Sequence, residues 1–179
     1  VLFRRQRQMC IRDSPTGAQL AAINDAAGGT ITLNANGQTF TGTAAQMKSA
    51  FAGGLAGTQT GAVKISDTNG TIAATTLTDI TAQTDGTVTA AAGGITIEGT
   101  TEEVTAAIVT GGTKAVMANG AVRLTDTGTV AATVLSGIGG TTGGTVTVVG
   151  AMTITGSTEE ITNALVTEAS KVIGTSANV

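Results

Sequence analysis

The sequence of 179 residues contains no His, Trp or Tyr, only three Phe, one Cys and one Pro. Without His, the chain lacks the usual base of a Ser-His triad and the commonest nitrogen ligand of metal ions. The single cysteine, Cys10, excludes an internal disulfide and any metal site made of several cysteines. These absences remove most familiar catalytic and metal sites from consideration.

Charged residues are also scarce, at 12% of the chain, and the net charge is −3. Of the 9 basic and 12 acidic residues, four Arg and Asp13 lie in the first fourteen positions, which leaves 5 basic and 11 acidic residues, or −6, for the remainder. Such an acidic body argues against nucleic acid and anionic membrane surfaces as partners. No apolar run approaches the roughly 18 residues of a membrane span, so we expect no membrane insertion.

Residues 1–15 differ in composition from the rest, because Val1–Ser14 has no Thr whereas 37 Thr follow from Thr16 onward. The string RRQRQMCIRDS resembles translated sequencing-adapter read-through, as found at the edges of open reading frames from metagenome assemblies. The longest apolar run here, Met9–Ile11, is too short for a signal peptide. We expect residues 1–15 to be a non-native or disordered segment.

An internal repeat of 57 residues dominates the remaining chain. Gly42, Gly99 and Gly156 each precede a near copy of one segment, which reads TAAQM, TTEEV and STEEI. A fixed period of this size predicts stacked supersecondary units. We expect residues 16–179 to form a tandem repeat array of about three such doublets, incomplete at both ends.

Short helices are predicted where two apolar residues stand three or four positions apart after a Thr or Ser. The six pairs are Leu20/Ile23, Met47/Phe51, Leu77/Ile80, Val104/Ile108, Leu135/Ile138 and Ile161/Leu165. Thr100 with Glu103, and Ser157 with Glu160, match the capping box at the start of a helix. Helices this short need packing against other elements to be stable.

Strands are predicted where Val or Ile alternates with polar residues, since this pattern gives a strand one buried face. The predicted strands are Gly29–Leu33, Ala62–Ile65, Gly86–Thr89, Ile95–Ile97, Ala121–Leu124, Gly144–Val148 and Met152–Ile154. Each doublet therefore divides into two α-β-β halves of about 28 residues.

Two α/β repeat architectures fit this order. In a solenoid, strands of successive halves stack in parallel, with a helix on one side. In the alternative, each strand pair is a hairpin of a ββα repeat with helices on one sheet face, and Asn36-Gly37 and Asn119-Gly120 are hairpin signals. The near-constant length of the halves favours the solenoid.

The acidic residues offer little sign of catalysis. Glu102-Glu103 and Glu159-Glu160 recur at the same helical position, where negative charge favours the positive end of the helix dipole. The Gly-rich tract Gly139–Gly144 lacks both phosphate-binding patterns and fits corners or helix C-caps. We predict no catalytic and no cofactor-binding residues, and no enzyme activity.

Asp67 and Asp126 are the only candidate metal ligands, because each lies in an oxygen-rich turn that could hold Ca²⁺. An Asx-turn with Gly explains the same sequence without a metal. The calcium-binding nonapeptide GGxGxDxUx is absent. Calcium is therefore the weaker of the two interpretations.

Paired threonines on strand faces provide a second candidate function. Stacked halves would align them into a flat array, as in ice-binding solenoids, although Thr is also an ordinary outward strand residue. The residues concerned are Thr30, Thr32, Thr39, Thr41, Thr87, Thr89, Thr145, Thr147, Thr153 and Thr155.

The alternation of GTVTV and MTITGSTEEITNAL with AVRLTDTGTVAATVL resembles the Thr/Ala/Gly/Val-rich tandem repeats of very large secreted bacterial surface proteins. These repeats are known from cyanobacteria and marine bacteria and are often labelled haemolysin-like or calcium-binding. The resemblance, from Thr16 to the C-terminus, implies an extracellular or cell-surface array with a structural or adhesive role. Its partners would be neighbouring repeats of the same chain, with ice or surface glycans in the alternative based on Thr.

Overall fold

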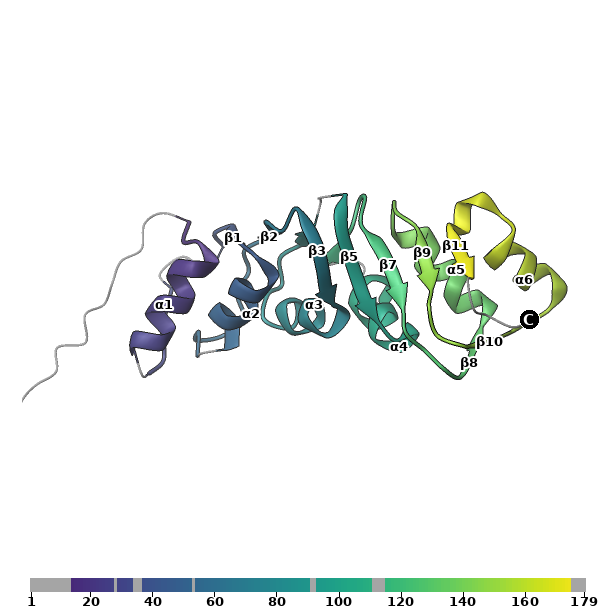
Figure 1. Ribbon diagram of the computed structural model, residues 1–179. Coiled ribbons are helices and arrows are strands. Elements are labelled where there is room, and N and C mark those ends of the chain that lie inside the picture. The colour runs from purple at the N-terminus through teal and green to yellow at the C-terminus, as the bar shows by residue number, and fades with distance from the viewer. Residues whose placement is uncertain are drawn as a thin grey trace, which may run out of the picture.

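The computed structural model describes residues 14–27, 29–33, 37–52, 54–90, 93–110 and 115–174. The fold is mixed α/β, with parallel sheets and with helices alternating with strands along the chain. The molecule is elongated, and its helices follow one another from α1 at one end to α6 at the other (Figure 1).

Helices form at all six predicted apolar pairs. They are α1 (Gly17–Ala27), α2 (Ala44–Ala52), α3 (Ala74–Thr81), α4 (Thr101–Val104), α5 (Ala132–Thr141) and α6 (Thr158–Leu165). Helix α4 continues into wider π-helical turns over Thr105–Thr110, and a 3₁₀ turn over Glu168–Ser170 follows α6.

The strands are short and number eleven within the described residues. They are β1 (Phe40–Gly42), β2 (Val63–Ile65), β3 (Asn69–Ala73), β4 (Val88–Ala90), β5 (Gly94–Gly99), β6 (Ala115–Val116), β7 (Ala121–Leu124), β8 (Thr129–Ala131), β9 (Val146–Val148), β10 (Thr153–Thr155) and β11 (Val172–Gly174). We call each helix, together with the strands between it and the preceding helix, a unit, and we count β11, which follows α6, as the next unit.

Every strand pairing is parallel and joins a strand to one in the next unit. The sheets run in the orders β1-β2-β4-β6, β3-β5-β7-β9-β11 and β8-β10. Phe40 pairs with Val63, Val63 with Val88, and Val122 with Val146, so that partners lie about one unit apart in the sequence. The hairpin alternative is wrong for these strands, because β6 and β7, which flank Asn119-Gly120, pair with other strands. Asn36 lies outside the described residues.

The first sheet and the last four strands of the second sheet have the same layout, with equivalent residues 57–59 positions apart. Gly42 ends β1 and Gly99 ends β5, while Val116 lies in β6 and Ile173 lies in β11. The sheets overlap along the molecule, since β3 begins the second sheet while β4 and β6 still extend the first.

The core lies between the helices and the inner faces of the strands. One row crosses the second sheet through Ile72, Ile97, Val122, Val146 and Val172, which are all buried. The helices contribute the predicted apolar pairs, of which Met47/Phe51, Leu77/Ile80, Val104/Ile108 and Leu135/Ile138 are fully buried. Burial of the aliphatic side chains in this row and in the helix pairs favours the packing of helices on strands.

Two predictions about the strands need correction. Gly29–Leu33 is not a strand, since only Ile31 forms a single bridge, to Leu55. Strands β3 and β8 were not predicted, because each runs directly into the Ala-rich start of a helix. Of the predicted non-native segment 1–15, residues 1–13 lie outside the described residues, and Pro15 is buried.

Candidate functional site

The polar residues singled out by the sequence lie at helix starts. Thr100 Oγ1 accepts a hydrogen bond from the Glu103 backbone nitrogen, and the Glu103 carboxylate accepts one from the Thr100 nitrogen at 2.9 Å. Ser157 and Glu160 make the same reciprocal pair at α6. Both predicted capping boxes are confirmed, and Glu103 and Glu160 therefore serve as helix caps.

The two earliest capped helices use Gln in place of Glu. Thr43 and Gln46 bond reciprocally at 3.0 and 3.2 Å at the start of α2, and Thr16 and Gln19 do so at α1. Helices α3 and α5 have no side-chain cap, because Ala73 and Ala131 occupy their N-cap positions. From α2 onward, capped and uncapped helices alternate, which matches a repeat of two units.

Asp67 and Asp126, the candidate calcium ligands, bind the helix start of the preceding unit. Asp67 Oδ2 accepts a hydrogen bond from the Ala44 nitrogen at 2.7 Å. Asp126 Oδ2 accepts from the Thr101 nitrogen, and Asp126 Oδ1 accepts from Thr101 Oγ1, both at 2.8 Å. Ala44 and Thr101 are the first residues of α2 and α4, so each aspartate satisfies a backbone donor that the capping box does not reach.

The Gly before each capping box permits close packing between helix starts. A Cβ at Gly99 would lie 2.8 Å from Glu103 Oε2 and 3.0 Å from the Cβ of Ala74, the first residue of α3. At Gly156 the same contacts would be made with Glu160 and with Ala132, the first residue of α5. Glycine is needed at these positions because two helix starts approach each other there.

Two buried threonines, which sequence reasoning missed, join successive units at a corner. Thr84 Oγ1 donates to the Gly61 carbonyl oxygen at 2.6 Å and accepts from the Gly86 nitrogen at 3.0 Å. Thr142, 58 residues later, donates to the Gly120 carbonyl and accepts from the Gly144 nitrogen. The GTVT repeat that follows each corner was the available signal, since both threonines stand two residues before its Gly.

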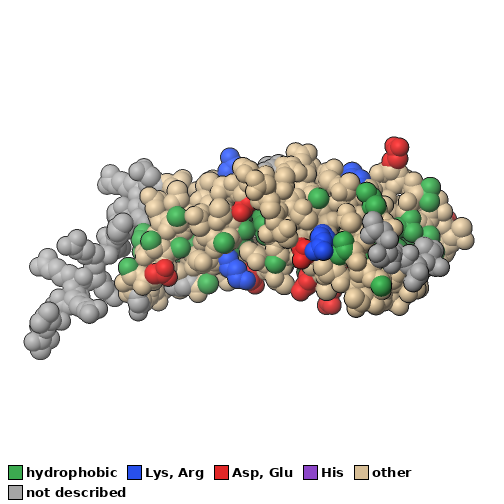
Figure 2. Space-filling model, viewed as in Figure 1, with side chains coloured by type: hydrophobic (Ala, Val, Ile, Leu, Met, Phe, Trp, Pro, Cys, Tyr) green, Lys and Arg blue, Asp and Glu red, His purple; other side chains and the backbone are tan. Residues whose placement is uncertain are grey.

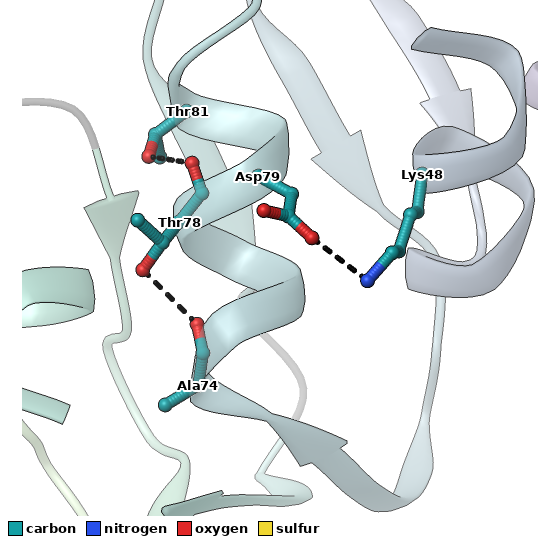
Figure 3. A network of polar contacts seen from close by, with 5 residues as sticks. All are labelled: Lys48, Ala74, Thr78, Asp79 and Thr81. Carbon is teal, nitrogen blue, oxygen red and sulfur yellow. Dashed lines mark hydrogen bonds and ion pairs between the residues drawn. The ribbon is translucent and has the colours of Figure 1, made fainter. Parts of the chain in front are cut away.

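Further polar contacts involve the ends and the outer faces of the helices. Lys171, in the left-handed region at φ 53°, donates from Nζ to the Thr142 carbonyl oxygen at 2.6 Å, beyond the C-terminus of α5. On the outside, Lys48 of α2 pairs with Asp79 of α3 at 2.7 Å, and within α3 the Thr78 hydroxyl bonds back to the Ala74 carbonyl (Figure 3). The ion pair is about half exposed, so it contributes little stability.

The ten paired threonines do not form one flat array. In the first sheet the outward row reads Thr41, Lys64, Thr89, Val116, so a lysine separates the two threonines. Thr147 lies between Arg123 and Ile173 in the second sheet. Thr153 and Thr155 lie in the third sheet, beside Thr129 and Ala131. Thr30, Thr32, Thr39, Thr87 and Thr145 are exposed and lie outside the paired strands.

Shallow depressions lie between neighbouring helices. One of about 470 Å³ lies between α2 and α3, and one of about 460 Å³ lies between α4 and α5. On the face shown in Figure 2, charged and hydrophobic side chains are scattered among other residues. Within the described residues, no three His, Cys, Asp or Glu side chains come close enough together to hold a metal ion, and no helix is long and apolar enough to cross a membrane.

Comparisons of the chain with protein-family models, with curated proteins and with solved structures gave no match. The arrangement of the molecule's own residues is therefore the basis for the function considered next.

Proposed function

We propose that residues 16–179 are a structural segment of a large secreted or cell-surface bacterial protein, in which they form a solenoid of α-β-β units and act as a spacer or adhesive stalk. The observation that carries the proposal is the use of polar side chains. Asp67, Asp126, Thr84 and Thr142 all bind backbone groups of a neighbouring unit. These side chains hold successive units together, and an extended array requires such contacts between its units.

The distribution of these contacts supports a repeated structure over a single site. Asp67 and Asp126 bind at α2 and α4, and Thr84 and Thr142 bind at two equivalent corners. A catalytic centre would need a unique group of side chains around one reacting atom. Here each polar contact is instead repeated once per doublet. Such repeated contacts support the length and the stiffness of an array.

The extracellular location and the adhesive part of the proposal rest on the resemblance to tandem repeats of secreted surface proteins. The array of ice- or glycan-binding threonines is not carried forward, because Lys64, Arg123 and Val116 interrupt its rows.

Duplicating one doublet tests the structural role. A second copy of residues 100–156, inserted after Gly156, joins Gly156 to Thr100 at a junction equivalent to Gly99-Thr100. If the units stack, small-angle X-ray scattering should show the maximum dimension growing by about 10–20 Å with an almost unchanged cross-section, since two units add strand and helix spacings. A larger cross-section without lengthening would contradict the proposal.

A further inference from the structure

Asn119 directly precedes Gly120 at the corner before β7. The Asn119 side chain is exposed and its backbone lies in a bend, whereas Gly120 is buried. Among the described residues, the Gly120 backbone nitrogen donates no hydrogen bond. Glycine has no side chain to shield this nitrogen, and it adopts the widest range of backbone angles. The nitrogen is therefore available to the neighbouring carboxamide of Asn119.

The other Asn-Gly pair within the described residues has a different backbone. Asn69 and Gly70 begin β3 and pair with Gly94 and Ile95 of β5. Pairing in a ladder keeps the chain extended, and the side chain then points away from the plane of the backbone amides. Asn69 is exposed like Asn119, so the two sites differ in backbone geometry and not in access to water.

The corner equivalent to that of Asn119 lacks the carboxamide. Gly61 there accepts the hydrogen bond of Thr84, as Gly120 accepts that of Thr142, but the residue before Gly61 is Thr60. Only one of these two corners thus combines an asparagine with the corner glycine.

We propose that Asn119 is a site of spontaneous deamidation and isomerisation to isoaspartate, with water as the only co-reactant. The Gly120 nitrogen loses its proton to a base in the solvent and bonds to Cγ of Asn119. The bond from Cγ to Nδ2 breaks, and Nδ2 takes up a proton and leaves as ammonia, so that a five-membered succinimide ring remains. Water then adds to either ring carbonyl and breaks its bond to the ring nitrogen. One product is aspartate, and the other is isoaspartate, in which the main chain continues through Cβ and Cγ.

Isoaspartate lengthens the main chain just before a contact between two units. The Gly120 carbonyl oxygen accepts hydrogen bonds from Thr142 Oγ1 and from the Gly144 nitrogen, both in the next unit. Thr142 is only 2% exposed, so its hydroxyl is shielded from water that could replace a lost acceptor. The additional main-chain bond, about 1.5 Å long, displaces the carbonyl from these donors. Conversion of Asn119 therefore weakens the contact of this unit with the next.

Peptide mapping of the whole folded chain measures the reaction. The protein is kept in mildly alkaline buffer at physiological temperature, and samples are digested with trypsin and compared with one digested at once. Cleavage after Lys114 and Arg123 releases residues 115–123, in which Asn119 is the only Asn. We expect this peptide to exchange one amide for a carboxyl group, with isoaspartate as the larger product by electron-transfer fragmentation. Asn119→Gln is the control and should stay unchanged, because its longer side chain would have to close a six-membered ring.

The unfolded chain supplies the reference for the effect of structure. In guanidinium chloride, Asn69 and Asn119 stand in the same dipeptide without fixed structure and should convert at similar rates. In the folded chain, Asn119 should convert about two- to tenfold faster than Asn69, the factor that one hydrogen bond of the β3–β5 ladder provides. The proposal is overturned if folded Asn119 keeps its amide while the unfolded chain loses it. It is overturned equally if folded Asn69 converts as fast as Asn119 or faster.

Urea denaturation tests the effect on the corner. In a background of Asn36→Gln and Asn69→Gln, protein in which Asn119 has converted should unfold at a lower urea concentration than fresh protein. Asn119→Asp is the matched control, since it adds the same charge without the additional main-chain bond, and its midpoint should stay close to that of fresh protein. Equal midpoints for the converted protein and Asn119→Asp would refute the weakening of the contact between units.

Discussion

Asp126 accepts two hydrogen bonds from Thr101, one from the backbone nitrogen and one from Oγ1, each at 2.8 Å. The two residues are 25 positions apart in the sequence and belong to successive units. The aspartate, which lies between β7 and β8, therefore fixes the register between α4 and these strands of the next unit. Asp67 makes the equivalent backbone contact to Ala44 at α2.

Replacing Asp126 with Ala should lower the free energy of unfolding by about 1–2 kcal/mol, because the first nitrogen and the hydroxyl of Thr101 both lose their acceptor. Asp126→Asn should cost less, since the amide oxygen can still accept one of the two bonds. Urea denaturation measures the change, and Asp25→Ala, at an exposed position of α1, is the control. An Asp126→Ala variant as stable as the control would contradict a capping role.

Thr84→Val should destabilise the protein by about 1–3 kcal/mol. The substitution keeps the shape but leaves the Gly61 carbonyl and the Gly86 nitrogen without their partner in a buried corner. Thr84→Ser should retain most of the stability because it keeps the hydroxyl. Thr87→Val, at an exposed position in the same segment, should change the free energy of unfolding by less than about 0.5 kcal/mol. Equal losses for Thr84→Val and Thr84→Ser would show that the hydrogen bonds are unimportant.

Local sequence patterns predicted those features of the fold that depend only on residues close together in the sequence. The capping box at Thr100 needs only Glu103 three residues later, and the row through Val122 and Val146 needs only alternation along each strand. The bond from Thr101 to Asp126 could not be foreseen in this way, because it depends on the register between two units. The division of the strands among three sheets was also hidden, because it depends on which strands of successive units pair, and alternation within a strand does not specify its partner.

Gly99→Ala should cost about 1–3 kcal/mol through overpacking. The new methyl group would displace the Glu103 carboxylate, which would then lose its bond to the Thr100 nitrogen, and would press on Ala74. Thermal unfolding followed by circular dichroism would detect the loss. Gly128→Ala is the matched control because no atom lies within 4 Å of the added Cβ. If the two variants have the same melting temperature, glycine is not required where two helix starts approach each other.

Gly137→Ala should instead stabilise the protein by about 0.5–1 kcal/mol. Gly137 lies within α5, is exposed, and has open space where a Cβ would stand. Alanine restricts the unfolded chain and favours the helix at no steric cost. Denaturation in urea should show a higher midpoint with an unchanged slope. A lower midpoint would mean that α5 is not helical at this residue in solution.

Removing divalent cations should leave the stability unchanged. The Asp67 and Asp126 carboxylates are already engaged with the starts of α2 and α4. Ca²⁺ takes six to eight oxygen ligands, and among the described residues no three His, Cys, Asp or Glu side chains gather around either aspartate. Melting curves with a chelator and with added Ca²⁺ should therefore coincide. An increase of several degrees with Ca²⁺ would contradict this expectation, and its loss in Asp126→Asn but not in Asp25→Asn would locate the ion at the candidate site.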